Sequence, residues 1–383
     1  MKEGWEYKKL GEVCDVQNGF AFNSKLFGSE PIGMPLIRIR DIKRGFSETY
    51  TSESCGEEFI VSNGDCLIGM DGDFNVGIWK GGTALLNQRV CKLVPSDKVS
   101  LKFLYYYIPE RLNEINSKTV FTTVKHLSSK QIKEIGVPDI SLSEQKRIVS
   151  YLDSAFAKID AVAKNAEASL NEAKALFQSA LSKMMEPKEG WEEKTLGELT
   201  SKITDGSHNP PRGVEHSNFM MLSSKNIRND RFSFDNPRYL KEADFEKENT
   251  RTDIEKGDVL LTIVGAGLGQ CCVYPADFKV TFQRSAAVIK PRKDIANNRF
   301  LMYVLQNEYE NIRAKSNGAA QMGIYLSQLT NYVLSVPSLS TQLSIVATLD
   351  TLKSKVDQLQ SNLSLTLSEC AALKQALLRE TFE

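Results

Sequence analysis

The chain has 383 residues, and its 48 basic and 48 acidic side chains give a formal net charge of zero at pH 7. With 41% hydrophobic and 25% charged residues, it has the composition of a globular protein long enough for two cores. No apolar run approaches the roughly 18 residues of a membrane span, and the N-terminal MKEGWEYKK lacks the apolar core of a signal peptide, so we expect a cytoplasmic protein without membrane contact.

The cysteines are scattered and odd in number, and none belongs to a CxxC pair. Only three histidines accompany them. Such a set is typical of free thiols in a reducing cytoplasm and favours neither disulfides nor a metal site. The cysteines are Cys14, Cys55, Cys66, Cys91, Cys271, Cys272 and Cys370.

The chain contains the same sequence twice. KEGWEYKKLGEV (2–13) matches KEGWEEKTLGEL (188–199) without a gap, and SEQKRIVSYLDSAFAKID (143–160) matches STQLSIVATLDTLKSKVD (340–357). Gln88-Arg89 is expected to match Gln283-Arg284. A period this long indicates a duplicated domain pair and not a solenoid. The interiors of the copies barely match, which predicts one scaffold with two different functional surfaces.

Short strands and helices are expected in each copy. In the first copy the strands are expected at 35–42, 65–70 and 89–94, and a helix at 103–115. The strands are rich in Val, Ile and Leu and bounded by Gly and Pro, so the fold class is predicted to be α/β or α+β. The counterparts in the second copy are strands at 219–227, 258–264 and 285–291 and a helix at 300–314.

Each copy ends in a long amphipathic segment. Apolar residues recur every three or four positions from Ile148 to Met184 and from Ile345 to Leu377, without Gly or Pro. Each segment predicts a helix of about 40 residues, and Ser143 is expected to begin the first one. The sustained stripe is typical of a coiled coil, and two such helices in one chain are expected to pack antiparallel. The alternative is that each stripe packs only on its own domain.

Several motifs together resemble the specificity subunit of type I restriction–modification systems. They are W-x-x-K-x-L-G-E at each copy's start, GD before a strand, QR before the next strand, and VPxxSLxEQ and LD around the long helix. The resemblance covers essentially the whole chain. It implies target-recognition domains at 1–140 and 187–339, each reading half of a bipartite DNA site. Spacer helices at 141–186 and 340–383 would hold these domains apart.

The two recognition domains resemble different classes of the family, and two segments depart from its pattern. TDGSHNPP (204–211) is similar to one class and NGFAFNSKLF (18–27) to another. STQLSI lacks the Glu and the basic pair of SEQKRI, so the two partner contacts need not be symmetric. DFNVGIW (73–79) replaces the glycine-rich form kept at 265–269. Related subunits also occur in type II systems that cut and methylate, and the motifs do not separate these settings.

Basic and polar residues of the divergent interiors are the candidates for DNA contact. Alternation along the expected strand would place Arg38 and Arg40 on one face, suited to phosphates or guanine edges. In the second copy, Asn can read adenine and Arg can read guanine. For any single arginine the alternative is a solvated strand face. The candidates are Arg38, Arg40, Lys43, Arg44, Ser207, His208, Ser223, Lys225, Asn226, Arg228 and Arg231.

Other recurring or notable residues are expected to be structural. The Gln-Arg pair occurs in both copies although their targets would differ, so base contact is not expected from it. Trp5 and Trp191 are expected to bury their rings against the core. His208 is expected to stabilise its loop or to face DNA, because no second metal ligand lies near it in the sequence.

The sequence favours a reader of DNA over an enzyme. VGAGLG (264–269) resembles a dinucleotide fingerprint, but QCCVYPADF follows it instead of a helix, which favours a tight turn. Asp71 and Asp73 carry no mark of catalysis, and no P-loop, nuclease cluster or NPPF/DPPY-type motif is present. The alternatives are a nucleotide-binding enzyme that uses GAGLG and a coiled-coil adaptor without DNA contact.

The resemblance also implies partners and cofactors. The expected partners are double-stranded DNA, two methyltransferase (M) subunits and restriction (R) subunits. S-adenosylmethionine would belong to the M subunits, which flip the target adenine, and ATP and Mg²⁺ to the R subunits. This chain is expected to hold no cofactor or metal itself. Its partner-docking residues are expected to be Glu144, Gln145, Arg147 and Gln342.

Overall fold

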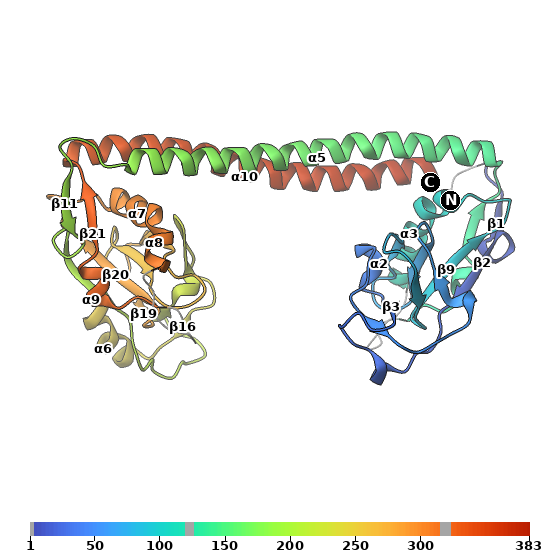
Figure 1. Ribbon diagram of the computed structural model, residues 1–383, viewed down its shortest axis with the longest axis horizontal. Helices are drawn as coiled ribbons and strands as arrows, with labels where there is room; N and C mark the ends of the chain where they lie inside the picture. The colour runs from blue at the N-terminus through green and yellow to red at the C-terminus, as the bar shows by residue number, and fades with distance from the viewer. Residues whose placement is uncertain (1–3, 119–125, 315–322) are drawn as a thin grey trace. The chain divides into compact units, whose positions relative to one another are not determined.

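The computed structural model describes residues 4–118, 126–314 and 323–383, which form two compact units (Figure 1). The first unit combines Met1–Ala166 with Ser364–Glu383, and the second is Glu167–Leu363. Both units contain part of each long helix, α5 (Leu142–Met185) and α10 (Leu339–Phe382), which have 44 residues each. The two predicted long helices are therefore confirmed. Within the described residues, no helix is long and apolar enough to cross a membrane.

The globular part of the first unit holds two sheets. The central sheet has the antiparallel order β2-β9-β6-β7, and a smaller sheet has the order β4-β3-β8-β5, in which β3 and β8 are parallel. β1 pairs separately with β10. The elements are β1 Tyr7–Lys9, α1 Leu10–Val13, β2 Cys14–Asn18, β3 Met34–Ile37, α2 Asp41–Arg44, β4 Tyr50–Thr51, β5 Ile60–Val61, β6 Cys66–Gly69, β7 Val76–Ile78, β8 Ala84–Leu86, β9 Val90–Pro95, α3 Leu101–Lys118, α4 Ser129–Lys133 and β10 Gly136–Pro138.

The second unit repeats this arrangement. Its central sheet has the order β12-β20-β17-β18, its smaller sheet has the order β16-β13-β19 with β13 and β19 parallel, and β11 pairs with β21. A hairpin, β14–β15, is added. The elements are β11 Glu192–Thr195, β12 Thr200–Asp205, β13 Met220–Leu222, β14 Ile227–Arg228, β15 Arg231–Phe232, β16 Arg238–Tyr239, α6 Glu242–Thr252, β17 Val259–Thr262, β18 Cys271–Val273, β19 Thr281–Phe282, β20 Ala286–Pro291, α7 Asn298–Asn307, α8 Tyr309–Ala314, α9 Leu326–Thr330 and β21 Val333–Val336.

The strand pairing confirms the internal repeat but corrects one predicted match. The Gln88 backbone N–H donates to the Phe20 carbonyl, and the Arg284 N–H donates in the same way to the Ser207 carbonyl. Gln88 is therefore equivalent to Arg284 and not to Gln283, and the register of the central sheets agrees. The matching Gln-Arg letters of the two copies lie one residue apart in the fold.

The central sheet of each unit is buried on both faces. In β17, Val259 and Leu261 face a cluster that includes α7 and the long helices, whereas Leu260 faces a cluster that includes the smaller sheet. β6 alternates in the same way. Because side chains point to opposite faces with a period of two, a strand between two cores reads as continuously apolar.

In the first unit, α3 is held on α5 by a carboxylate. Asp153 accepts hydrogen bonds from Lys102 Nζ and from the Tyr106 hydroxyl, both at 2.6 Å. Burial acts to raise the pKa of Asp153, but the hydrogen bonds from Lys102 and Tyr106 and the charge of Lys102 bring this pKa below its ordinary value. The carboxylate is therefore ionised at neutral pH and joins the two helices.

The second unit has the same contact between α7 and α10. Asp350 accepts from Arg299 Nη2 and from the Tyr303 hydroxyl, both at 2.7 Å. The leucine that precedes each aspartate, Leu152 or Leu349, is completely buried. These contacts give the recurring LD motif a structural role in joining the globular part to the long helix.

Within the first unit, α10 runs antiparallel to α5. Cys370 Sγ lies 3.8 Å from the Ile159 carbonyl oxygen. Lys374, one turn further along α10, lies 5.3 Å from the ring centroid of Phe156, which is earlier in α5. Residue numbers therefore rise along one helix as they fall along the other, as predicted.

The end of α10 completes the core of the first unit. Phe382 is 3% exposed, and its ring lies 5.7 Å from that of Phe103 and 5.3 Å from that of Tyr107. Trp5 packs against the same cluster, and Trp191 packs against the core of the second unit. The end of α10 therefore shares a core with Trp5.

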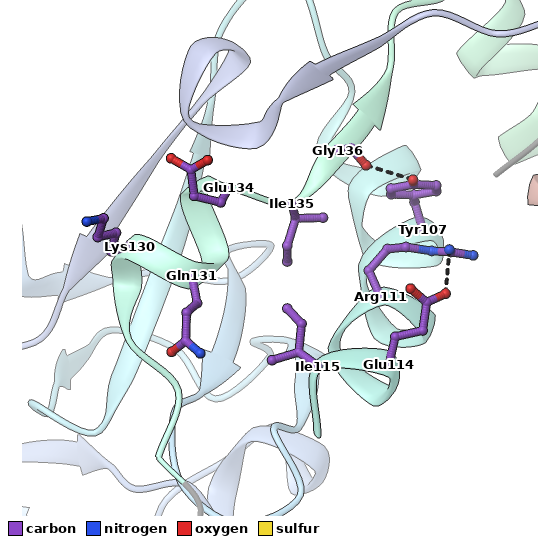
Figure 2. A pocket seen from close by; sticks show the side chains of 9 residues that line it. All are labelled: Tyr107, Arg111, Glu114, Ile115, Lys130, Gln131, Glu134, Ile135 and Gly136. Atoms are coloured by element: carbon purple, nitrogen blue, oxygen red, sulfur yellow. Dashed lines mark hydrogen bonds and ion pairs between the residues drawn. The ribbon is translucent and has the colours of Figure 1, made fainter. Parts of the chain in front are cut away.

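A cavity of about 440 Å³ lies between α3 and α4 of the first unit (Figure 2). Figure 2 shows Arg111 beside Tyr107 and Glu114. Arg111 Nη1 lies 2.5 Å from Glu114 Oε1. Arg111 is buried, and its Nη2 donates to Glu383 Oε1 at 3.1 Å. Two carboxylates thus balance this guanidinium, and none of the predicted DNA-contact residues lines the cavity.

Candidate nucleic-acid interface

Two segments of the divergent interiors occupy equivalent places in the two units. After β3 the chain forms a turn and α2, which packs on β6 and β7. After β13 it forms a short turn and the β14–β15 hairpin, which packs on β17 and β18. We call residues 38–48 the first insert and residues 223–235 the second insert. Nine of the eleven candidates for DNA contact lie in these inserts, all except Ser207 and His208.

The structure corrects the predicted strand of the first insert. β3 ends at Ile37, so Arg38 and Arg40 do not alternate along a strand. Asp41 Oδ2 accepts the Arg38 backbone N–H at 2.9 Å, which turns the chain into α2. Gly45, with φ of +77°, ends the helix in a left-handed conformation that favours glycine. A buried aspartate thus ends the strand that the sequence pattern extends to residue 42.

The basic side chains of the first insert are exposed. Arg40 Nη2 donates to Thr49 Oγ1 at 3.1 Å, and Arg44 Nη2 lies 2.9 Å from Glu48 Oε2. Arg44 also lies 4.4 Å from the centre of the Phe46 ring. Arg38 and Lys43 are exposed as well. These side chains can reach phosphate oxygens, the contacts that dominate affinity for DNA.

Two further basic residues belong to this surface. Lys43 and Arg44 line a cavity of about 720 Å³ together with Lys80 and Lys102. Lys80 follows β7, and its backbone N–H donates to the Gly45 carbonyl at 3.2 Å. Lys80 and Lys102 are far from the insert in sequence, and the packing of both α2 and α3 on β7 brings them together. Sequence reasoning therefore missed both.

In the second insert, Asn226 has a structural role, which corrects its predicted base contact. It is 5% exposed, and its Oδ1 accepts the Ser223 N–H at 3.0 Å. Its Nδ2 donates to the carbonyls of Ser233 at 3.0 Å and Asp235 at 2.9 Å. Contact with a base would break these buried bonds, at a cost of about 1–3 kcal/mol for each unsatisfied group. Ser223 is half-buried, and its Oγ accepts the Lys225 N–H at 3.4 Å.

The three basic side chains of the second insert have different contacts. Lys225 and Arg228 are exposed, and Arg228 Nη1 donates to the Ile227 carbonyl at 2.8 Å. Arg231 Nη2 lies 3.0 Å from Asp357 Oδ1 on α10. Arg231 is thus paired with the long helix although its side chain is 55% exposed, so base contact by Arg231 stays a prediction, and Lys225 and Arg228 are accessible to DNA as well.

The TDGSH segment forms a loop organised by Asp205. This buried carboxylate lies 2.7 Å from His208 Nε2 through Oδ2, and its Oδ1 accepts from Arg251 Nη2. His208 is half exposed, so it both stabilises the loop and presents an edge to solvent. Among the residues that the structure describes, no group of His, Cys, Asp and Glu side chains could hold a metal ion.

The next two residues of this loop are tightly packed. A Cβ on Gly206 would lie 2.0 Å from the Phe282 carbonyl oxygen, so only glycine fits. Ser207 is buried, and its N–H donates to the same carbonyl at 2.7 Å. Its burial contradicts the predicted DNA contact of Ser207.

The glycine-rich segment at 265–269 is the turn between β17 and β18. The Gly269 N–H donates to the Thr262 carbonyl at 2.8 Å, and Gly265 and Gly269 have φ of +101° and +88°. The turn leads directly into the antiparallel strand β18. A dinucleotide fingerprint requires the N-terminus of a helix at this point, so the predicted tight turn is confirmed.

Two of the four predicted docking residues are buried amides. Gln145 is 2% exposed, and its Oε1 accepts the Ser100 N–H at 2.8 Å. Its Nε2 donates to the carbonyls of Lys98 at 3.1 Å and Ile140 at 3.0 Å. Gln342, 1% exposed, makes the equivalent bonds to Asn297, Ile295 and Pro337. Both glutamines join the long helix to the globular part, so their predicted contact with a partner is wrong.

Glu144 and Arg147 lie on the exposed side of the same helical turn. Arg147 donates to both oxygens of Glu144, at 2.7 and 2.8 Å. The helix begins at Leu142, and Ser141 Oγ accepts the Glu144 N–H at 3.2 Å, so Ser141 caps it instead of the predicted Ser143. The surface position of the ion pair is compatible with docking, which stays a prediction for these two residues.

Comparison with known proteins identifies the family. The family model described as Type I restriction modification DNA specificity domain matches residues 2–172 and 188–367. The chain belongs to the type I specificity-subunit family. The specificity subunit of the type I restriction enzyme EcoBI from Escherichia coli is 30% identical to it, over 100% of this chain and 86% of that protein. The MjaVIII specificity subunit of Methanocaldococcus jannaschii is 23% identical, over 93% and 88% of the two chains.

Solved structures share the fold of this specificity subunit. One, from work on complex assembly and conformational transition of the type I R-M system, has a TM-score of 0.74 at 20% identity and covers 100% of this chain and 98% of its own. The HsdS subunit from Thermoanaerobacter tengcongensis has a TM-score of 0.55 at 19% identity, with 100% and 97% covered. With two matched specificity domains, this specificity subunit recognises a DNA target in two parts.

Proposed function

We propose that this chain is a non-catalytic subunit in which each unit contacts one half of a bipartite DNA target. The observation that carries the proposal is the repeated scaffold with unrelated basic inserts on equivalent strands. The first unit would contact DNA through Arg38, Arg40, Lys43 and Arg44, and the second through Lys225, Arg228 and His208. The hairpin geometry of the GAGLG turn speaks against the alternative of a nucleotide-binding enzyme.

The chemistry would belong to partner subunits. Two methyltransferase (M) subunits carrying S-adenosylmethionine would dock on the long helices, and restriction (R) subunits would bring ATP and Mg²⁺. Large apolar side chains exposed on both helices are compatible with this docking, because a partner subunit would remove them from water. They include Tyr151, Val162, Leu176, Leu365 and Leu373. The type I relatives favour this setting over a related type II system.

Removing two cations of the first insert is expected to weaken DNA binding in a salt-dependent way. The double variant Lys43→Ala/Arg44→Ala is compared with the wild type, each assembled with its methyltransferase partners. Its plot of log K against log salt concentration should have a negative slope that is smaller in magnitude by about 2, one unit for each lost phosphate contact. Binding to DNA is measured over a range of salt concentrations for the wild type and the variant.

The matched control for this experiment is Lys98→Ala/Lys130→Ala. It removes the same charge from exposed positions of the first unit outside the insert, and its slope should stay near that of the wild type. If the wild-type assembly bound no DNA, the proposed function would be excluded and the coiled-coil adaptor would be favoured. Equal slopes for the two double variants would exclude the insert as a phosphate-contact surface.

A further inference from the structure

The second insert is tied to α10 by a chain of alternating charges. Arg231 Nη2 lies 3.0 Å from Asp357 Oδ1, and Lys353 Nζ lies 2.6 Å from the same oxygen. Lys353 Nζ is also 3.9 Å from Asp230 Oδ2, and Arg299 Nη1 is 3.1 Å from Asp230 Oδ1. Arg299 in turn holds Asp350 of α10. The tip of the β14–β15 hairpin therefore contacts both α7 and the long helix within this unit.

The middle of this chain is shielded from water. The side chains of Asp230 and Lys353 are 12% and 17% exposed. Exposed ion pairs contribute little, but a shielded charge that loses its partner costs far more than the pair contributes. The hairpin tip is also fixed by its backbone, since the Asp230 N–H donates to the Cys271 carbonyl at 3.0 Å. Lys353 and Asp357 thus restrain the insert from outside its own sequence.

The positions of the first unit that correspond to Lys353 and Asp357 make different contacts. At the offset that places Gln145 on Gln342, Lys353 corresponds to Phe156 and Asp357 to Asp160. Phe156 packs edge-on against Tyr106 of α3, and Asp160 pairs with Lys374 at 2.5 Å. In the described part of the first unit, the ion pairs of the insert stay within residues 40–48. The link from insert to long helix is therefore particular to the second unit.

We propose that Lys353 and Asp357 of α10 are positioning residues for DNA discrimination by the second unit. They hold the β14–β15 hairpin, and with it the exposed Lys225 and Arg228, in the geometry that distinguishes a correct base pair from a wrong one. Discrimination needs this restraint because a recognition group displaced by about 1 Å loses its hydrogen bonds to the base edge. This inference rests on the proposed function, and it adds that residues of the spacer helix set the specificity of one half-site.

The test compares Asp357→Asn with the wild type, each assembled with its methyltransferase partners. Affinity is measured for the cognate duplex and for duplexes with single base-pair changes in either half-site. We expect discrimination at one half-site to fall about tenfold and discrimination at the other to stay unchanged. The salt slope should not change, because Asp357 contacts no phosphate. Asp357→Glu should retain discrimination, because it keeps the negative charge that Arg231 and Lys353 share.

The matched control is Asp160→Asn, which removes the equivalent acid of the first unit and should leave both half-sites unchanged. Thermal melting of the free subunit verifies that both variants are folded. The inference is overturned if Asp357→Asn behaves like Asp160→Asn, if both half-sites lose discrimination equally, or if Asp357→Glu loses discrimination as Asp357→Asn does. A wild-type assembly without sequence preference would instead overturn the proposed function, and this inference with it.

Discussion

Replacing Phe382 with alanine is expected to destabilise the first unit by about 3–5 kcal/mol, the usual cost of removing a buried aromatic ring. Phe382 is almost completely buried against Phe103 and Tyr107, although it is the penultimate residue of the chain. Hydrogen exchange followed by mass spectrometry measures the loss separately for each unit. Protection should fall in the first unit and remain in the core strands of the second.

Leu373→Ala is the matched control for this prediction. Leu373 lies on the same helix within the first unit and is 50% exposed, so its loss should cost less than about 1 kcal/mol. If Phe382→Ala lowered protection no more than Leu373→Ala, the end of the chain would not be part of the first core. Equal loss of protection in both units would contradict the division of the core described above.

Replacing Gln145 or Gln342 with alanine is expected to cost about 3 kcal/mol in the unit concerned. Each substitution leaves one N–H and two carbonyls at this partly buried junction without partners, and each such group costs up to about 1–3 kcal/mol less any gain from water entry. The free energy of unfolding is measured in denaturant for the subunit without partners. Because the measurement contains no methyltransferase, a large effect cannot come from lost docking.

Glu144→Ala provides the contrast, since Glu144 lies on the surface one residue before Gln145. Its loss should change the free energy of unfolding by less than about 0.5 kcal/mol. Effects of similar size for Glu144→Ala and Gln145→Ala would contradict the assignment of Gln145 to the buried junction. Gln342→Ala should resemble Gln145→Ala, because the two amides make equivalent hydrogen bonds.

The sequence predicts the architecture well because duplication and periodicity act over long segments. Two copies of one pattern imply two similar units, and an apolar stripe without Gly or Pro implies a long helix. The burial of the two glutamines at the helix starts could also have been predicted from the sequence. Gln145 and Gln342 lie three residues before Ile148 and Ile345, on the apolar stripe itself. Polar residues at such positions face the core and must be hydrogen-bonded there.

The inserts could not be predicted, because their conformation depends on single side-chain contacts. Alternating residues at 36–40 read as a strand, but Asp41 ends it through one hydrogen bond. Asn226 has a side-chain amide of the kind that binds adenine, but this amide accepts the Ser223 N–H and closes a turn. In the sequence Arg231 is near the other basic residues of the insert, but in the fold it pairs with Asp357 of α10, more than 100 residues further along the chain. Residue propensities for helix, strand or turn do not predict these side-chain contacts, because the contacts depend on how the elements pack in the fold.

Recognition of a two-part DNA target is tested most directly by mapping methylated adenines in a host that carries this subunit with its methyltransferase. Deleting the gene should remove one motif made of two half-sites separated by an unspecified gap. Inserting one heptad into both α5 and α10 should keep both half-sites and widen the gap by about three base pairs, since seven helical residues add about 10 Å. Recognition of a two-part target would be contradicted if the deletion removed no motif or removed a motif without a gap. An unchanged gap after the insertion would contradict the role of the two helices as spacers.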